Sequence, residues 1–183
     1  MSDPPSRRER LRRHLRLIDE GVAPVVARYG DQMQCRPGCS ECCGQTFTVS
    51  ELEGDYLREG LAALDADTRA DILERAARWQ PDRREPCPVL GDDGCCRMYE
   101  HRPRVCRKYG IPLWHPDRPH EVRCCPLNFQ GQGEIDAELF LDPQARWAEA
   151  WIELRAQLGM PPQQDRTIAE HLLAAAEPVA RRE

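Results

Sequence analysis

The chain has 183 residues, ten of them cysteines, and a net charge of −5 at neutral pH. Its length suits one domain, and the 40% of hydrophobic residues suffice for a modest core. The negative charge gives no general attraction to nucleic acid or to a membrane surface. No run of about 18 apolar residues occurs, and no signal-peptide pattern follows Met1. We therefore expect a cytoplasmic protein with reduced thiols and with neither nucleic acid nor a membrane as partner.

Hydrophobic periodicity predicts several helices. Residues 6–29 place apolar side chains at helical spacing beneath an arginine-rich face, which favours an amphipathic helix over a polyanion-binding arm. Ser50 followed by Glu53 is a capping-box pattern and predicts the start of a second helix. A third helix is expected to end before Pro81.

The composition changes between residues 81 and 133, where proline, glycine, cysteine and arginine dominate. This composition predicts irregular structure that is held together by ligands. Within it, residues 91–94 separate two short apolar runs, which is typical of a small β-hairpin with Cys87 and Cys96 at its ends.

The C-terminal part is again predicted to be helical, over residues 143–180 with a break at Gly159. Neither an internal repeat nor a clear domain boundary is visible, so we expect a single domain over 1–183. In it the helix at 6–29 and the helices at 143–180 flank a cysteine-cluster core at 35–125. The expected fold class is mainly α, with a small irregular, cysteine-rich centre pinned by metal and room for one short β-hairpin.

The grouping of the cysteines predicts metal binding. Four lie close together, and the other six follow between residues 87 and 125; the ten are Cys35, Cys39, Cys42, Cys43, Cys87, Cys95, Cys96, Cys106, Cys124 and Cys125. Short segments that contain several thiolates supply several ligands at little cost in loop-closure entropy. In a reducing compartment such a pattern favours metal over disulfides or a redox relay.

Eight thiolates are enough for two tetrahedral sites. The first four cysteines suffice for one, and the ligands left for a second are Cys87, Cys96, Cys106 and one of Cys124 and Cys125. Zinc and iron–sulfur clusters both use four thiolates, so the metal stays open between zinc and iron. The nearby histidines are alternative ligands but are more typical of surface residues: His101, His115 and His120.

The same motifs resemble a known family. The segments Cys35-x3-Cys39-x2-Cys42-Cys43, Cys87-Pro-Val-Leu and Cys96-x2-Tyr-Glu-x-Arg-Pro-x2-Cys106-Arg resemble the YkgJ-like zinc- or iron-chelating cysteine-cluster proteins (CxxxCxxCC proteins), over about residues 35–125. The resemblance implies eight functional cysteines, which correspond to Cys35, Cys39, Cys42, Cys43, Cys87, Cys96, Cys106 and one of Cys124 and Cys125. Cys95 and the second cysteine of the last pair are additional to the family pattern.

The resemblance implies a metal-binding protein without a defined activity. A related cysteine pattern occurs in flagellin lysine N-methylases, and this similarity implies an alternative, a metal- or iron–sulfur-dependent enzyme that modifies a protein or peptide. The polar residues between the cysteines at 96 and 106 are more typical of packing and charge compensation than of catalysis: Tyr99, Glu100 and Arg102. Catalytic and cofactor-binding residues therefore stay unassigned.

Overall fold

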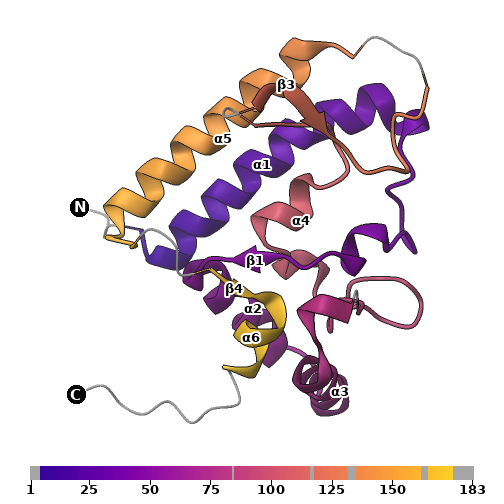
Figure 1. Cartoon of the computed structure of the whole chain (residues 1–183). Coiled ribbons are helices and arrows are strands. Elements are labelled where there is room, and N and C mark those ends of the chain that lie inside the picture. The colour runs from indigo at the N-terminus through magenta and orange to yellow at the C-terminus, as the bar shows by residue number, and fades with distance from the viewer. Residues whose placement is uncertain (1–4, 84, 116–117, 132–134, 162–164, 175–183) are drawn as a thin grey trace. The chain divides into compact units, whose positions relative to one another are not determined.

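The computed structural model describes residues 5–83, 85–115, 118–131, 135–161 and 165–174 (Figure 1). Six α-helices and two short antiparallel strand pairs make up the regular structure of these ranges, so the prediction of a mainly α fold is confirmed. Contacts divide the chain into a first unit, Met1–Cys42 with Arg104–Pro162, and a second unit, Cys43–Pro103 with Gln163–Glu183. The expectation of a single domain stays a prediction.

The first unit is built on two long helices. Its elements are α1 (Arg7–Tyr29), the 3₁₀ turn η1 (Gly30–Gln32), α4 (Arg104–Lys108), β2 (Leu113–His115), β3 (Arg118–Arg123) and α5 (Ala137–Gln157). Ser6 begins α1 with a capping box, as its side chain accepts from the Glu9 N–H while the Glu9 carboxylate accepts from the Ser6 N–H. In Figure 1 the indigo α1 and the orange α5 run side by side, and α4 packs against α1.

The core of this unit lies between α1 and α5. Its buried members are Ile18, Val25, Tyr29, Ile111, Phe140 and Trp147. The two helices approach closely at Gly21, where an added Cβ would lie 2.6 Å from the Trp147 ring. The Trp147 indole N–H is satisfied by the Leu17 carbonyl at 3.0 Å. The strand β2 packs on α5, and Ile111, the residue after Gly110, is buried in this core.

The second unit consists of shorter elements. They are β1 (Thr48–Val49), α2 (Glu51–Ala62), α3 (Ala66–Arg78), the 3₁₀ turns η3 (Pro81–Arg83) and η4 (Tyr99–His101), β4 (Arg166–Thr167) and α6 (Ile168–Leu173). The capping box predicted at Ser50 and Glu53 is present. The helix α6 packs on α2 and α3, and β1 pairs with β4 with Thr48 opposite Thr167.

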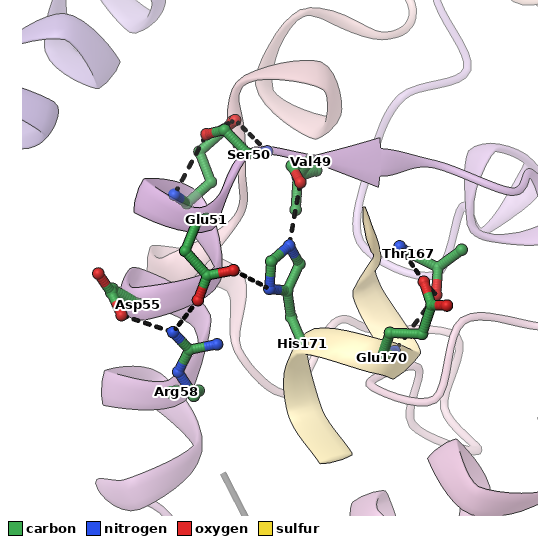
Figure 2. Close-up of polar contacts among 9 residues, drawn as sticks. Val49, Ser50, Glu51, Asp55, Arg58, Thr167, Glu170 and His171 are labelled. Carbon is green, nitrogen blue, oxygen red and sulfur yellow. Dashed lines mark hydrogen bonds and ion pairs between the residues drawn. The ribbon is translucent and has the colours of Figure 1, made fainter. Parts of the chain in front are cut away.

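A buried histidine anchors α6 in this unit (Figure 2). The His171 side chain is fully buried, with Nε2 2.9 Å from the Val49 carbonyl and Nδ1 3.8 Å from a Glu51 oxygen. Arg58 holds Glu51 and Asp55 at 2.7 and 2.5 Å. Burial disfavours the charge on Glu51, but the hydrogen bond and the charge of Arg58 outweigh it and lower the pKa of the Glu51 carboxyl. His171 thus ties α6 to β1 by a hydrogen bond and places its ring beside Glu51 on α2.

The structure refines the predicted boundaries. The helix expected from residue 143 begins earlier, because Asp136 caps α5 and Pro143 lies within it. The predicted hairpin is reduced to one antiparallel bridge between Leu90 and Cys96. The β2–β3 pair lies in a stretch that was expected to be irregular. That expectation came from the high proline content of the stretch, which is typical of loops. Residues 175–180 of the predicted last helix lie outside the described ranges. Among the helices that are described, none combines the length and apolar character needed to cross a membrane.

Candidate metal centre

The first unit contains six of the ten cysteines, on three separate segments. One segment leaves η1 and turns at Gly38, where φ is 89° and the Cys39 N–H donates to the Arg36 carbonyl at 2.9 Å. The 3₁₀ turn η2 (Glu41–Gly44) follows and carries the adjacent Cys42 and Cys43. The other cysteines of this unit are Cys106 on α4 and the pair Cys124 and Cys125 after β3. Cys35 and Cys39 therefore lie in a loop rather than along one helix.

Two thiols of this unit, those of Cys35 and Cys124, have pKa values that burial and neighbouring thiols raise. Although Cys35 is exposed as a residue, its sulfur is partly covered, and this loss of water raises the pKa of its thiol, with partial compensation by a hydrogen bond from Asn128. The neighbouring thiols that raise it further are those of Cys39, Cys125 and Cys42. Burial and the nearby Cys125 raise the pKa of Cys124 to about 11. We refer to Cys35, Cys39, Cys42, Cys124 and Cys125 as the Cys35 group.

Asn128 joins the segments of the Cys35 group. Its side chain is buried, with 4% of its surface exposed. The oxygen Oδ1 accepts from the Gln34 N–H at 2.8 Å, and Nδ2 donates to the Gly110 carbonyl at 2.6 Å and to Cys35 Sγ at 3.2 Å. The pattern of cysteines gave no indication of this residue, which follows Cys125 by three positions.

The backbone of Gly110 packs against the sulfur of Cys35. Its φ of +123° is strained for any residue with a Cβ, and an added Cβ would lie 2.7 Å from Cys35 Sγ. Its carbonyl accepts from Asn128, and the Cys124 sulfur lies 3.4 Å from the same oxygen. Glycine at this position therefore leaves room for a sulfur atom and places a carbonyl beside a second one.

Tyr109 lies near the thiols of the Cys35 group. Burial raises the pKa of its phenol, and the thiols of Cys125 and Cys42 raise it further. Two residues before Tyr109, the Arg107 guanidinium on α4 pairs with Asp19 on α1 at 2.5 Å. This ion pair holds α4, and with it Cys106, against α1.

The second unit contains the other four cysteines, which are linked through their backbones. The Cys87 N–H donates to the Cys43 carbonyl at 2.7 Å, so these two residues lie side by side. The Gly91 N–H donates to the Cys95 carbonyl at 2.8 Å, and Cys96 bridges to Leu90. All four side chains are half-buried. Because the Leu90 N–H donates to the Cys87 carbonyl at 2.9 Å and Leu90 bridges to Cys96, these two cysteines lie in one compact loop.

The other polar residues singled out from the sequence lie in the second unit. The Arg102 guanidinium stacks on the Tyr99 ring at 3.5 Å and donates to the Tyr99 carbonyl at 3.1 Å. The His101 ring packs on Tyr56, with 4.7 Å between centroids, and the Tyr56 hydroxyl donates to the Glu100 carbonyl. These contacts agree with a packing role. The side chains of His115 and His120 lie outside what the structure describes.

The donor set fits a thiophilic metal ion. Across the described ranges, no three His, Cys, Asp or Glu side chains converge on a point where an ion would sit, so the Cys35 group is a set of neighbours rather than a closed shell. A cation between neighbouring thiolates offsets their mutual repulsion, and a bound metal deprotonates its thiols. The space that Gly110 leaves for the Cys35 sulfur and the Asn128 N–H directed at that sulfur both suit a metal-coordinating thiolate.

Comparison with known proteins identifies the family of this chain. Residues 34–128 match the model of the CxxCxxCC family, whose description reads "Putative zinc- or iron-chelating domain". This range includes all ten cysteines as well as Gly110 and Asn128. No curated protein and no solved structure matches the chain.

Proposed function

Because the chain belongs to the CxxCxxCC zinc- or iron-chelating family, we propose that it binds zinc or iron through its cysteine thiolates. The observation that supports this most directly is the Cys35 group, in which residues about 90 positions apart in the sequence share one thiol-rich neighbourhood. The proposed ligands are Cys35, Cys39, Cys42, Cys43, Cys87, Cys96, Cys106, Cys124 and Cys125. Iron is proposed either as an ion or within an iron–sulfur cluster.

A metal in these positions would contribute mainly to folding. The thiol-bearing segments between residues 33 and 47 have little regular structure and are held by a few hydrogen bonds, among them those to Asn128. Zinc or iron supplies binding free energy that exists only in the folded arrangement, and it requires deprotonated thiols. The reducing environment that keeps such thiols available agrees with a cytoplasmic location, which we include in the proposal.

The test is the content of zinc, iron and acid-labile sulfide, together with an absorption spectrum, in protein purified without oxygen. About two zinc ions and no colour would indicate structural zinc, whereas iron with sulfide and a brown colour would indicate a cluster. Removing the metal with a strong chelator is expected to lower the melting temperature. Protein that contains neither metal, and that melts identically with and without added zinc or iron, would contradict the proposal.

An enzymatic role is the second candidate, and the uneven exposure of the Cys35 group favours it. Cys35 is exposed whereas Cys125 is buried, so one side of the group faces solvent, as an open coordination position requires. The reaction class is modification of a protein or peptide, by similarity to flagellin lysine N-methylases. Anaerobic addition of S-adenosylmethionine or of a lysine-containing peptide should then change the spectrum of the bound metal. An unchanged spectrum with both additions would exclude this role for those ligands.

A further inference from the structure

Asn128 stands out among the buried polar residues of the first unit because its contacts converge on Cys35. One amide oxygen and one amide nitrogen fix two backbone groups, the Gln34 N–H and the Gly110 carbonyl, at 2.8 and 2.6 Å. The nitrogen also reaches Cys35 Sγ at 3.2 Å. Gln34 directly precedes Cys35 in the chain, and Gly110 packs against the Cys35 sulfur. These three contacts of the Asn128 side chain therefore all lie at or beside Cys35.

The orientation of this amide is determined by its partners. The Gln34 group is a donor and the Gly110 group is an acceptor, so exchanging the amide oxygen and nitrogen would create two repulsive contacts. The nitrogen must therefore face Gly110 and Cys35. A primary amide has two N–H groups, and once one is engaged by the Gly110 carbonyl the other is available to the sulfur.

We propose that Asn128 is a positioning residue of the metal centre: it holds the Cys35 segment against Gly110 and donates an N–H to the Cys35 sulfur while that thiolate is bound to metal. This inference rests on the proposed metal-binding function. The N–H of Asn128 fixes the direction of the Cys35 sulfur, and a hydrogen bond to a charged ligand atom is stronger than one to a neutral atom. Groups that orient a ligand in this way typically change metal affinity by about 10–100-fold when they are removed.

Gln144 provides a matched control in the same unit. It is also a buried amide, with 9% of its surface exposed, and it also bridges two backbone groups. Its oxygen accepts from the Trp114 N–H and its nitrogen donates to the Pro112 carbonyl, both at 2.9 Å. Each of the two amides thus bridges two backbone groups. In the described part of the chain, only Asn128 of the two also contacts a sulfur atom.

The experiment compares Asn128→Leu with Gln144→Met, two near-isosteric changes that each remove a buried amide. Zinc affinity is measured by competition with a chromophoric chelator, and stability by thermal melting. We expect Asn128→Leu to weaken zinc binding by about 10–100-fold and Gln144→Met to leave the affinity unchanged, although both lower the melting temperature. Equal losses of affinity in the two variants would reduce Asn128 to a general structural role and overturn the inference.

A double-mutant cycle tests whether Asn128 acts through Cys35. In a Cys35→Ala background, Asn128→Leu should cause no further loss of zinc affinity, because the sulfur that it serves is absent. An undiminished loss in that background would overturn the inference. If wild-type protein binds neither zinc nor iron, the proposed function fails and this inference fails with it; if wild-type protein binds zinc and Asn128→Leu binds it equally well, only the inference fails.

A measurement on the wild-type protein covers the case in which Asn128→Leu does not fold. Protein loaded with a magnetically active cadmium isotope, which substitutes for zinc, is studied by NMR. A side-chain amide proton of Asn128 should show coupling to cadmium, transmitted through the Cys35 sulfur and the hydrogen bond. Cadmium bound without any coupling to this amide would contradict the proposed contact.

Discussion

His14 makes the stability of the first unit sensitive to acid. This residue on α1 is 5% exposed, its ring packs on Trp151 with 5.2 Å between centroids, and neither ring nitrogen has a hydrogen-bond partner in the described part of the chain. Burial, followed by the positive charges of Arg104 and Lys108, lowers its pKa from 6.5 to about 4. The folded protein therefore holds His14 neutral over a range of pH in which the unfolded chain protonates it.

The pKa difference sets the size of the effect. The folded state binds the proton less well, so the stability that depends on neutral His14 is complete above pH 6.5 and is lost as the pH falls towards 4. At 1.36 kcal/mol per pH unit, the full difference corresponds to about 3.4 kcal/mol. Most of this loss, about 2.4 kcal/mol, falls between about pH 7 and about pH 4.5.

The assay is urea denaturation of the wild-type protein and of His14→Leu at these two pH values. Protonation of metal-bound thiolates also destabilises both proteins in acid, so the difference between them isolates His14. We expect His14→Leu to gain about 2.4 kcal/mol relative to wild type on going from neutral to acidic pH. A difference between the two proteins that stays constant over this range would refute the reasoning.

Two further substitutions test close contacts, and a third tests whether Cys95 is a metal ligand. Gly110→Ala should lower metal content as well as stability, because its Cβ would collide with Cys35 Sγ, whereas Gly131→Ala, with nothing within 4 Å, should do neither; elemental analysis compares them. Gly54→Ala would make its Cβ collide with His171 Nδ1 and should lower the free energy of unfolding by about 1–3 kcal/mol, measured by thermal melting; an unchanged melting temperature would disprove this. Cys95→Ser should retain the wild-type metal content, and a loss of one metal ion would make Cys95 a ligand.

The helices could be predicted because their signals are local. Ser50 and Glu53 form a capping box within four residues, and the spacing of apolar side chains in 6–29 is realised in α1. The start of α5 was missed because Asp142 followed by Pro143 resembles a helix start. The actual first turns are stabilised by the burial of Phe140 in the core, a tertiary contact that the local sequence does not contain.

Only the cysteines of the candidate site could be proposed from the sequence. Their spacing indicates metal chemistry without reference to the fold, since thiolates at short intervals have few other uses in a reducing environment. Asn128 and Gly110 could not be inferred in this way. Asn128 meets Cys35 across 93 positions of sequence, and Gly110 is needed because of a positive φ and a sulfur atom that come together only in the folded chain.

The thiols of the Cys35 group differ in exposure, and this difference affects which of them an oxidant reaches first. Accessibility is one factor that governs the oxidation of thiols, and by this factor an oxidant reaches the exposed Cys35 before the buried Cys125. The sulfur that Asn128 and Gly110 hold in place is then also the one on which the oxidative lifetime of the centre depends.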